Sequence, residues 1–209
     1  MKFYSALILL LASLSPTAQS QEILAPGEQP QITIDANETV RLVFGKEEQI
    51  YYATSNDKGQ SFSEPVAIAQ VKGMHLGMTR GPQLATSKDY SVVTAIDKEG
   101  NIHSFQLTHS SGKWRTLQNV NDSDGSAPEG LMSLASDDKN NFFAVWLDLR
   151  KDHKNNICFS TLRGNKGWSE NRFAYTSPES HVCECCKPSI AVNGNHVVIM
   201  FRNWLKGSR

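Results

Sequence analysis

Four charged residues of this chain have side-chain types that suit ligand recognition. They are Arg80, Glu129, Asp148 and Arg202, and each lies next to a short apolar run of a kind that forms a β-strand. The guanidinium fork of an arginine can bond both oxygens of a carboxylate at once. Polar residues are common in loops, so one alone means little. The four together predict a binding site for a polar ligand.

Soft ligands form a second group near the C-terminal end. Cys183, Cys185 and Cys186 lie within four residues, two positions after His181, and Cys158 is the fourth cysteine. An even count in an exported protein is typical of disulfides. Imidazole and thiolate groups at this spacing also suit zinc or copper(I). Disulfide, metal site and free thiols therefore stay open as alternatives, and no other cofactor is indicated.

The elements that must position these residues repeat along the chain. Short apolar strands begin at Pro30, Pro82, Met132 and Pro188, at separations of 52, 50 and 56 residues. Each is followed by a polar turn and an apolar run. The first three units continue with a third strand, a glycine turn that ends on an aromatic residue, and a short fourth strand. The expected second strands are 40–44, 91–96, 142–147 and 197–201, the third 50–54, 102–107 and 157–161, and the fourth 66–68, 116–120 and 173–175.

This repeat predicts an all-β fold made of four-stranded antiparallel units, which is typical of β-propeller blades. Blades pack side by side around a channel, because one blade cannot bury both its faces alone. In that arrangement the loops between second and third strands share one face with the links between blades. The charged and soft residues above fall on this face. It also receives His75, Asp97, Asp122, Asp124, Arg150, Glu184 and Asn203.

The turn of residues 55–62 carries the strongest short motif, S-x-D-x-G-x-[ST]-[WF]. An aspartate can accept hydrogen bonds from backbone N–H groups of its own turn, and glycine supplies the positive φ. The turns that end on Trp114 and Trp168 are weaker copies. These turns are expected on the face opposite to the charged residues, where their role is structural. The motif residues are Ser55, Asp57, Gly59, Ser61 and Phe62.

This turn is similar to the Asp-box, or BNR repeat, of bacterial neuraminidases. Together with segments 79–82, 129–135, 145–150, 182–188 and 200–203, it makes residues 30–209 resemble a secreted bacterial exo-α-sialidase-like group of the sialidase superfamily. The resemblance implies a six-bladed propeller when complete. Here it covers about three and a half four-stranded blades, so we expect a truncated propeller or one that a partner completes.

The same resemblance implies roles for the charged residues. Sialidases bind the substrate carboxylate with three arginines and use a tyrosine nucleophile, its activating glutamate and an aspartate acid/base. Arg80 and Arg202 are the better candidates for the arginine clamp, and Arg150 and Arg209 the weaker ones, with Asn203 beside them. Asp148 would be the acid/base and Glu129 a partner carboxylate. The opening Arg-Ile-Pro segment and the late-blade tyrosine are absent, which argues against hydrolysis of sialic acid.

The composition and the N-terminal segment limit the classes of partner and the cellular location that we expect. Lysine plus arginine total 21 and aspartate plus glutamate total 21, so charge gives no reason to expect nucleic acid or an anionic membrane. Lys2, the apolar stretch 3–14 and small residues at 18 and 20 predict a signal peptide over 1–20; an uncleaved anchoring helix is the alternative. Residues 21–209 would be the propeller domain, secreted or periplasmic, without a transmembrane segment.

Two functions remain as hypotheses at this point. The first is an exported sialidase-like propeller that acts on or binds glycans, an exo-α-sialidase or other glycoside hydrolase included. The second is a non-catalytic propeller that serves protein interaction or metal handling in the cell envelope.

Overall fold

The computed structural model describes residues 24–178 and 181–205. The expected signal peptide at 1–20 and Arg209 lie outside the described residues. All regular structure in the described ranges is β, in three four-stranded sheets and one two-stranded sheet. Within these ranges no helix is long and apolar enough to cross a membrane. The prediction of an all-β fold with four-stranded antiparallel sheets is confirmed.

Every sheet is formed by strands that are consecutive in sequence and antiparallel. The first sheet contains β1 (Glu28–Ile34), β2 (Val40–Lys46), β3 (Gln49–Ser55) and β4 (Val66–Gln70); the second contains β5 (Gln83–Thr86), β6 (Tyr90–Ile96), β7 (Ile102–Thr108) and β8 (Lys113–Thr116); the third contains β9 (Met132–Ser136), β10 (Asn141–Asp148), β11 (Asn156–Arg163) and β12 (Arg172–Tyr175); and the fourth contains β13 (Ser189–Asn193) and β14 (His196–Met200).

The middle strands of the second and third sheets are buried on both faces. In β6, Val92 and Ile96 pack toward the third sheet, while Val93 and Ala95 pack toward the first. Successive side chains of a strand point to opposite faces, so an unbroken apolar run serves two cores. The strand β10 does the same with Trp146 toward the second sheet and its neighbours toward the fourth. The sheets are therefore stacked face to face.

One expected strand is wrong in position. The fourth strand of the second sheet was expected at 116–120 but is β8, Lys113–Thr116. Gly112 adopts a φ of 64° and reverses the chain at once, so that Lys113 already pairs with Thr108. Beyond β8 the chain still follows β7, through a hydrogen bond from Val120 N to Ile102 O of 2.8 Å.

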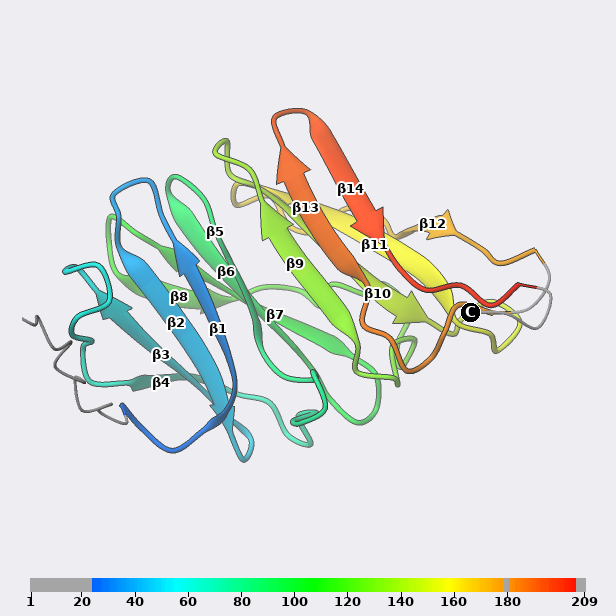
Figure 1. Cartoon of the computed structure of the whole chain (residues 1–209), viewed down its shortest axis with the longest axis horizontal. Helices are drawn as coiled ribbons and strands as arrows, with labels where there is room; N and C mark the ends of the chain where they lie inside the picture. The colour runs from blue at the N-terminus through cyan, green and yellow to red at the C-terminus, as the bar shows by residue number, and fades with distance from the viewer. Residues whose placement is uncertain (1–23, 179–180, 206–209) are drawn as a thin grey trace, which may run out of the picture.

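The first strands of the four sheets, β1, β5, β9 and β13, lie next to one another and point toward the same end of the molecule (Figure 1). The loops therefore sort into two groups. We call the end where these strands begin the start face; it holds segments 71–82, 97–101, 117–131, 149–155, 181–188 and 201–205. We call the other end the turn face; it holds the turns that follow β1, β5, β9 and β13 and the turn of residues 55–62.

Candidate functional site

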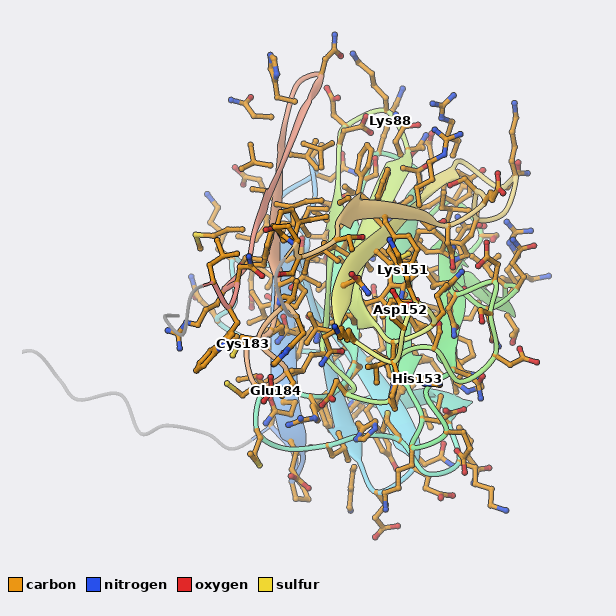
Figure 2. The ribbon with its side chains drawn as sticks, turned by 90° about the vertical axis from the view of Figure 1, so that its right-hand side faces the viewer. Lys88, Lys151, Asp152, His153, Cys183 and Glu184 are labelled. Carbon is orange, nitrogen blue, oxygen red and sulfur yellow. The ribbon has the colours of Figure 1, made fainter. Side chains whose placement is uncertain are left out.

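The charged residues singled out in the sequence lie in start-face segments or at their borders. Figure 2 shows Cys183, Glu184 and His153, a residue of the loop after β10, well away from Lys88, which follows β5 on the turn face. The segments of the start face come from all four sheets. Their side-chain contacts decide which residues can meet a ligand and which hold the fold.

Arg80 and Glu129 are brought together, but through the backbone of Glu129. The Nε of Arg80 donates to the Glu129 carbonyl oxygen at 2.6 Å. Among the described residues, the terminal nitrogens of Arg80 have no hydrogen-bond partner. Asn155 Nδ2 lies 3.5 Å from Glu129 Oε1, and the Oδ1 of this buried asparagine has no partner. Three segments thus meet here, and they leave unsatisfied polar atoms.

Lys187 and Gln83 belong to the same face and were missed in the sequence. Lys187 Nζ donates to Gln83 Oε1 at 2.9 Å, and Gln83 Nε2 donates to the carbonyls of Gly81 and Pro82 at 3.1 and 3.2 Å. Burial lowers the pKa of Lys187. A signal was present, because Lys187 precedes Pro188 much as Arg80 precedes Pro82 in the repeat.

Asp148 does not face the solvent. Its side chain is 0% exposed and accepts hydrogen bonds from Trp146 Nε1 at 2.8 Å and from Arg150 N and Nε at 3.0 and 2.9 Å. A carboxylate so enclosed does not reach a substrate in this structure. Its position supports a structural role in place of the expected acid/base role.

Arg150 is occupied in the same network. Its Nη1 bonds Asp122, and its Nη2 donates to Asn171 Oδ1 at 2.8 Å and to Ser126 Oγ at 3.3 Å. Burial lowers the pKa of Arg150, but its bonds to Asp148 and Asp122 outweigh this and raise it overall. Arg150 therefore ties the loop after β10 to the segment before β9, and it has little capacity left for a ligand.

Arg202 and Asn203 differ in exposure and contacts. Arg202 is exposed, and its carbonyl accepts a hydrogen bond from Cys183 N at 3.0 Å. Asn203 Nδ2 donates to the Tyr175 hydroxyl at 2.7 Å, and its Oδ1 is buried without a partner. The guanidinium of Arg202 is available to a ligand, whereas Asn203 supports the fold beside it.

The remaining acid and imidazole groups of this face are mostly held in place. Asp97 accepts hydrogen bonds from Asn101 N at 2.8 Å and from His103 Nε2 at 2.7 Å. Burial, and next the charge of Arg80, lower the pKa of His75, whose Nε2 is buried without a partner. His75 thus adds a buried imidazole nitrogen beside Arg80.

The cysteines separate into a cluster and one core residue. The Sγ of Cys183 lies 3.0 Å from that of Cys185 and 3.6 Å from that of Cys186, and the latter two are 3.6 Å apart. Cys158 is 1% exposed in the core between the second and third sheets, and burial raises its pKa to about 12. His181 bonds Glu184 at 3.0 Å and stacks on Trp204. Among the expected ligands only the three clustered thiols converge.

The turn of residues 55–62 has the hydrogen bonds expected of it. Asp57 Oδ1 accepts from Ser61 N at 2.9 Å, and Ser55 Oγ accepts from Gly59 N at 2.8 Å, with Gly59 at a φ of 87°. Hydrogen bonds from the Ser55 and Ser61 side chains hold the pKa of Asp57 well below its usual range. All these groups satisfy one another, which indicates a structural turn.

The turn face also carries a hollow of about 630 Å³ that was not expected. The turns after β1, β5, β9 and β13 line it, and Asp35 and Asp137 are among its residues. Both carboxylates are already used inside their own turns: Asp137 Oδ1 accepts from Lys139 N and Asn141 N at 2.8 and 2.9 Å. These bonds indicate that the acidic groups shape the turns.

The bonded carboxylates predict a loss of stability in acid. Burial raises the pKa of Asp137, but hydrogen bonds from Asn141 and Lys139 outweigh it and lower the pKa overall. A folded-state pKa below the unfolded value of about 3.9 stabilises the fold above that pH, and this stability is lost as the pH falls through the folded pKa. Urea titrations at pH 6 and pH 3 should show a lower midpoint at pH 3. Asp137→Asn should narrow that difference, whereas Asp138→Asn next to it should not; equal effects would contradict the assignment.

Comparison with known proteins gives a fold and no closer relationship. No protein-family model matches the chain, and no curated protein matches its sequence. Among solved structures it is similar to the GH93 α-L-arabinofuranosidase of Fusarium graminearum, with a TM-score of 0.53, 13% identity, and 78% of this chain matched to 52% of that one. It is also similar to the NanB sialidase of Streptococcus pneumoniae, with a TM-score of 0.52, 12% identity, and 84% of this chain matched to 28% of that one. The SapL1 lectin gives a TM-score of 0.53 and 14% identity, with 85% of this chain matched to 57% of the lectin.

The chain spans about half the length of the arabinofuranosidase that it matches. The arabinofuranosidase structure was solved with arabinobiose and the lectin structure with α-methyl fucoside. At these identities the likeness concerns the fold. The likeness therefore extends to the arrangement of four-stranded antiparallel sheets, which this chain shares with β-propeller glycosidases.

Proposed function

We propose that this chain is an exported sialidase-type propeller that binds acidic glycans on its start face. Several of the structures it resembles belong to proteins that act on or bind carbohydrate, such as the arabinofuranosidase, the sialidase and the lectin. We identify the turn of residues 55–62 as an Asp-box and the four sheets as consecutive blades. Export rests on the predicted signal peptide.

One observation carries the choice of an acidic ligand. Lys187, just before β13, reaches Gln83 at the start of β5, although β9 lies between these two strands. Arg80 lies just before β5 and bonds the backbone of Glu129, just before β9. The two cations therefore flank the beginning of β9. A carboxylate-bearing sugar between them would receive charge-assisted hydrogen bonds, which are about twice as strong as neutral ones.

Binding is better supported than hydrolysis by the described residues. The expected acid/base, Asp148, is enclosed by Trp146 and Arg150. Glu129 stays close to Asn155, and its carboxylate is half-buried on the start face. Of the two carboxylates expected to act as a pair, only that of Glu129 is accessible, and one member alone does not supply the pair that glycoside hydrolysis uses.

The test is a binding titration of the full chain with acidic and neutral oligosaccharides. Lys187→Met and Arg80→Gln should each weaken binding of the acidic sugars by roughly 10- to 100-fold, the equivalent of one charge-assisted hydrogen bond. Lys88→Met is the matched control, because this exposed lysine lies on the turn face, and it should change affinity less than about twofold.

Two results would overturn this proposal. One is the absence of binding to any acidic sugar; the other is a loss with Lys88→Met equal to that with Lys187→Met. Sugar release is assayed in the same samples. Release that Glu129→Gln abolishes while binding persists would add catalysis to the proposal and assign it to Glu129.

A further inference from the structure

The thiols of Cys183, Cys185 and Cys186 form a cluster that glycan binding does not use. The three sulfurs are separated by 3.0, 3.6 and 3.6 Å, and they come from a stretch of four residues. Cys183 is buried, Cys186 is half-buried and Cys185 is exposed. Sulfurs at this spacing, open to solvent on one side, surround a point that an ion can reach.

The backbone at the N-terminal side of the cluster is anchored both to the start of the third sheet's β11 and to the segment after β14. Val182 is fully buried and donates its N–H to Asn155 O at 2.9 Å, and Cys183 N donates to Arg202 O at 3.0 Å. The chain then turns through a hydrogen bond from Cys186 N to Cys183 O at 3.4 Å. The convergence of the thiols is therefore set by the fold and does not depend on the side chains alone.

The donor set is all sulfur. Thiolates are soft ligands that select copper(I) and zinc over calcium or magnesium. Arg202 and Lys187 adjoin the loop and would offset the negative charge that three thiolates leave on a bound cation. Among the described residues the ligand atoms that converge are these three sulfurs without an imidazole, and the Nε2 of His181 bonds Glu184.

We propose that Cys183, Cys185 and Cys186 form a three-thiolate site for one thiophilic cation, copper(I) or zinc(II). Binding releases the protons of the thiols that ionise, so uptake becomes stronger as the pH rises. Copper(I) is satisfied by three thiolates. Zinc, which is almost always four-coordinate in proteins, would take its fourth ligand from water or from a bound molecule.

A competing state is a disulfide between two of the three thiols. An odd number of sulfurs in the cluster would then leave one cysteine over, and Cys158 lies apart in the core formed with the second sheet. The cluster therefore does not close into two bridges without moving a core strand. One bridge within the cluster would block the metal site and is an outcome that the experiment must detect.

The experiment titrates the reduced, full-length protein under anaerobic conditions. Copper(I) is delivered as its acetonitrile complex against a coloured copper(I) chelator, and zinc(II) against a coloured zinc chelator. We expect one ion per chain. X-ray absorption of the loaded protein should show three sulfur neighbours, and for zinc these should lie at about 2.3 Å.

Single substitutions distinguish the residues that bind the metal from neighbouring residues that do not. Cys183→Ser, Cys185→Ser and Cys186→Ser should each weaken binding at least about 100-fold, which is the upper end of what loss of a supporting residue alone costs. Cys158→Ala and His181→Ala are the controls and should retain one ion per chain. Because Cys185 is exposed, Cys185→Ser should fold normally, which circular dichroism checks.

The copper(I) and zinc(II) titrations together identify the metal. Uptake of copper(I) with three sulfurs identifies a trigonal site, and uptake of zinc with three sulfurs and one oxygen identifies an open tetrahedral site. Either supports the proposal. Failure of both ions to compete with the chelators, or a disulfide within the cluster that persists in reductant and prevents uptake, would overturn it.

Discussion

Replacement of Asp148 by alanine is expected to lower the free energy of unfolding by about 3–5 kcal/mol, as for the loss of one partner of a buried ion pair. The side chain of Asp148 is 0% exposed and that of Arg150 is 22% exposed. Without the carboxylate, Arg150 keeps its bonds to Asp122 and Asn171 but loses the buried acceptor of its Nε. The Trp146 indole N–H also loses its partner in the core. Chemical denaturation of the purified variant measures the difference.

Two further variants show whether this role is structural. Asp148→Asn keeps an oxygen for the Arg150 Nε and should lose less stability than Asp148→Ala. Asp124→Ala removes an exposed carboxylate from the same face and should change stability by less than about 0.5 kcal/mol. If Asp148→Ala instead unfolded at the wild-type denaturant concentration, the structural role would be refuted.

The burial of Asp148 shows how far sequence reasoning reaches. Trp146 and Asp148 are two residues apart in one strand, so alternation already places them on one face. The partners that enclose the network, Asp122 and Asn171, lie 28 and 21 residues away from Arg150. No local sequence pattern predicts these contacts, because they form only when the third sheet is folded. The strand pattern therefore predicts where the loop after β10 lies, but it does not predict the partners of the charged side chains in that loop.

The strands were predicted more fully than the site for a related reason. An apolar and β-branched run bounded by turns is a local property, and the run Val92 to Ile96 shows it in five consecutive residues. The meeting of Lys187 with Gln83 depends instead on how β5, β9 and β13 stand next to one another. The convergence of Cys183, Cys185 and Cys186 was visible because they are neighbours in the chain. The separation of Cys158 from them was not, since its face of β11 is decided by packing against the second sheet.

The second large effect is expected at Trp168, which joins two sheets. It follows β11 in the third sheet, yet its Nε1 donates to Ser104 Oγ of β7 at 3.0 Å, and its side chain is buried in the core between the second and third sheets. Trp168→Ala should lower the free energy of unfolding by about 3–5 kcal/mol, because a cavity forms where two sheets meet. Thermal and denaturant unfolding of the variant would show it directly.

Matched variants distinguish this inter-sheet contact from general loss of an aromatic residue. Trp168→Phe keeps most of the buried surface and loses the bond to Ser104, so about 1–2 kcal/mol is expected. Phe62 ends the equivalent turn of the first sheet, but it is half-buried, and the described residues contain no earlier sheet for it to pack on. Phe62→Ala should therefore cost clearly less than Trp168→Ala. Equal losses would mean that these aromatic residues stabilise their own turns and not the stacking of one sheet on the next.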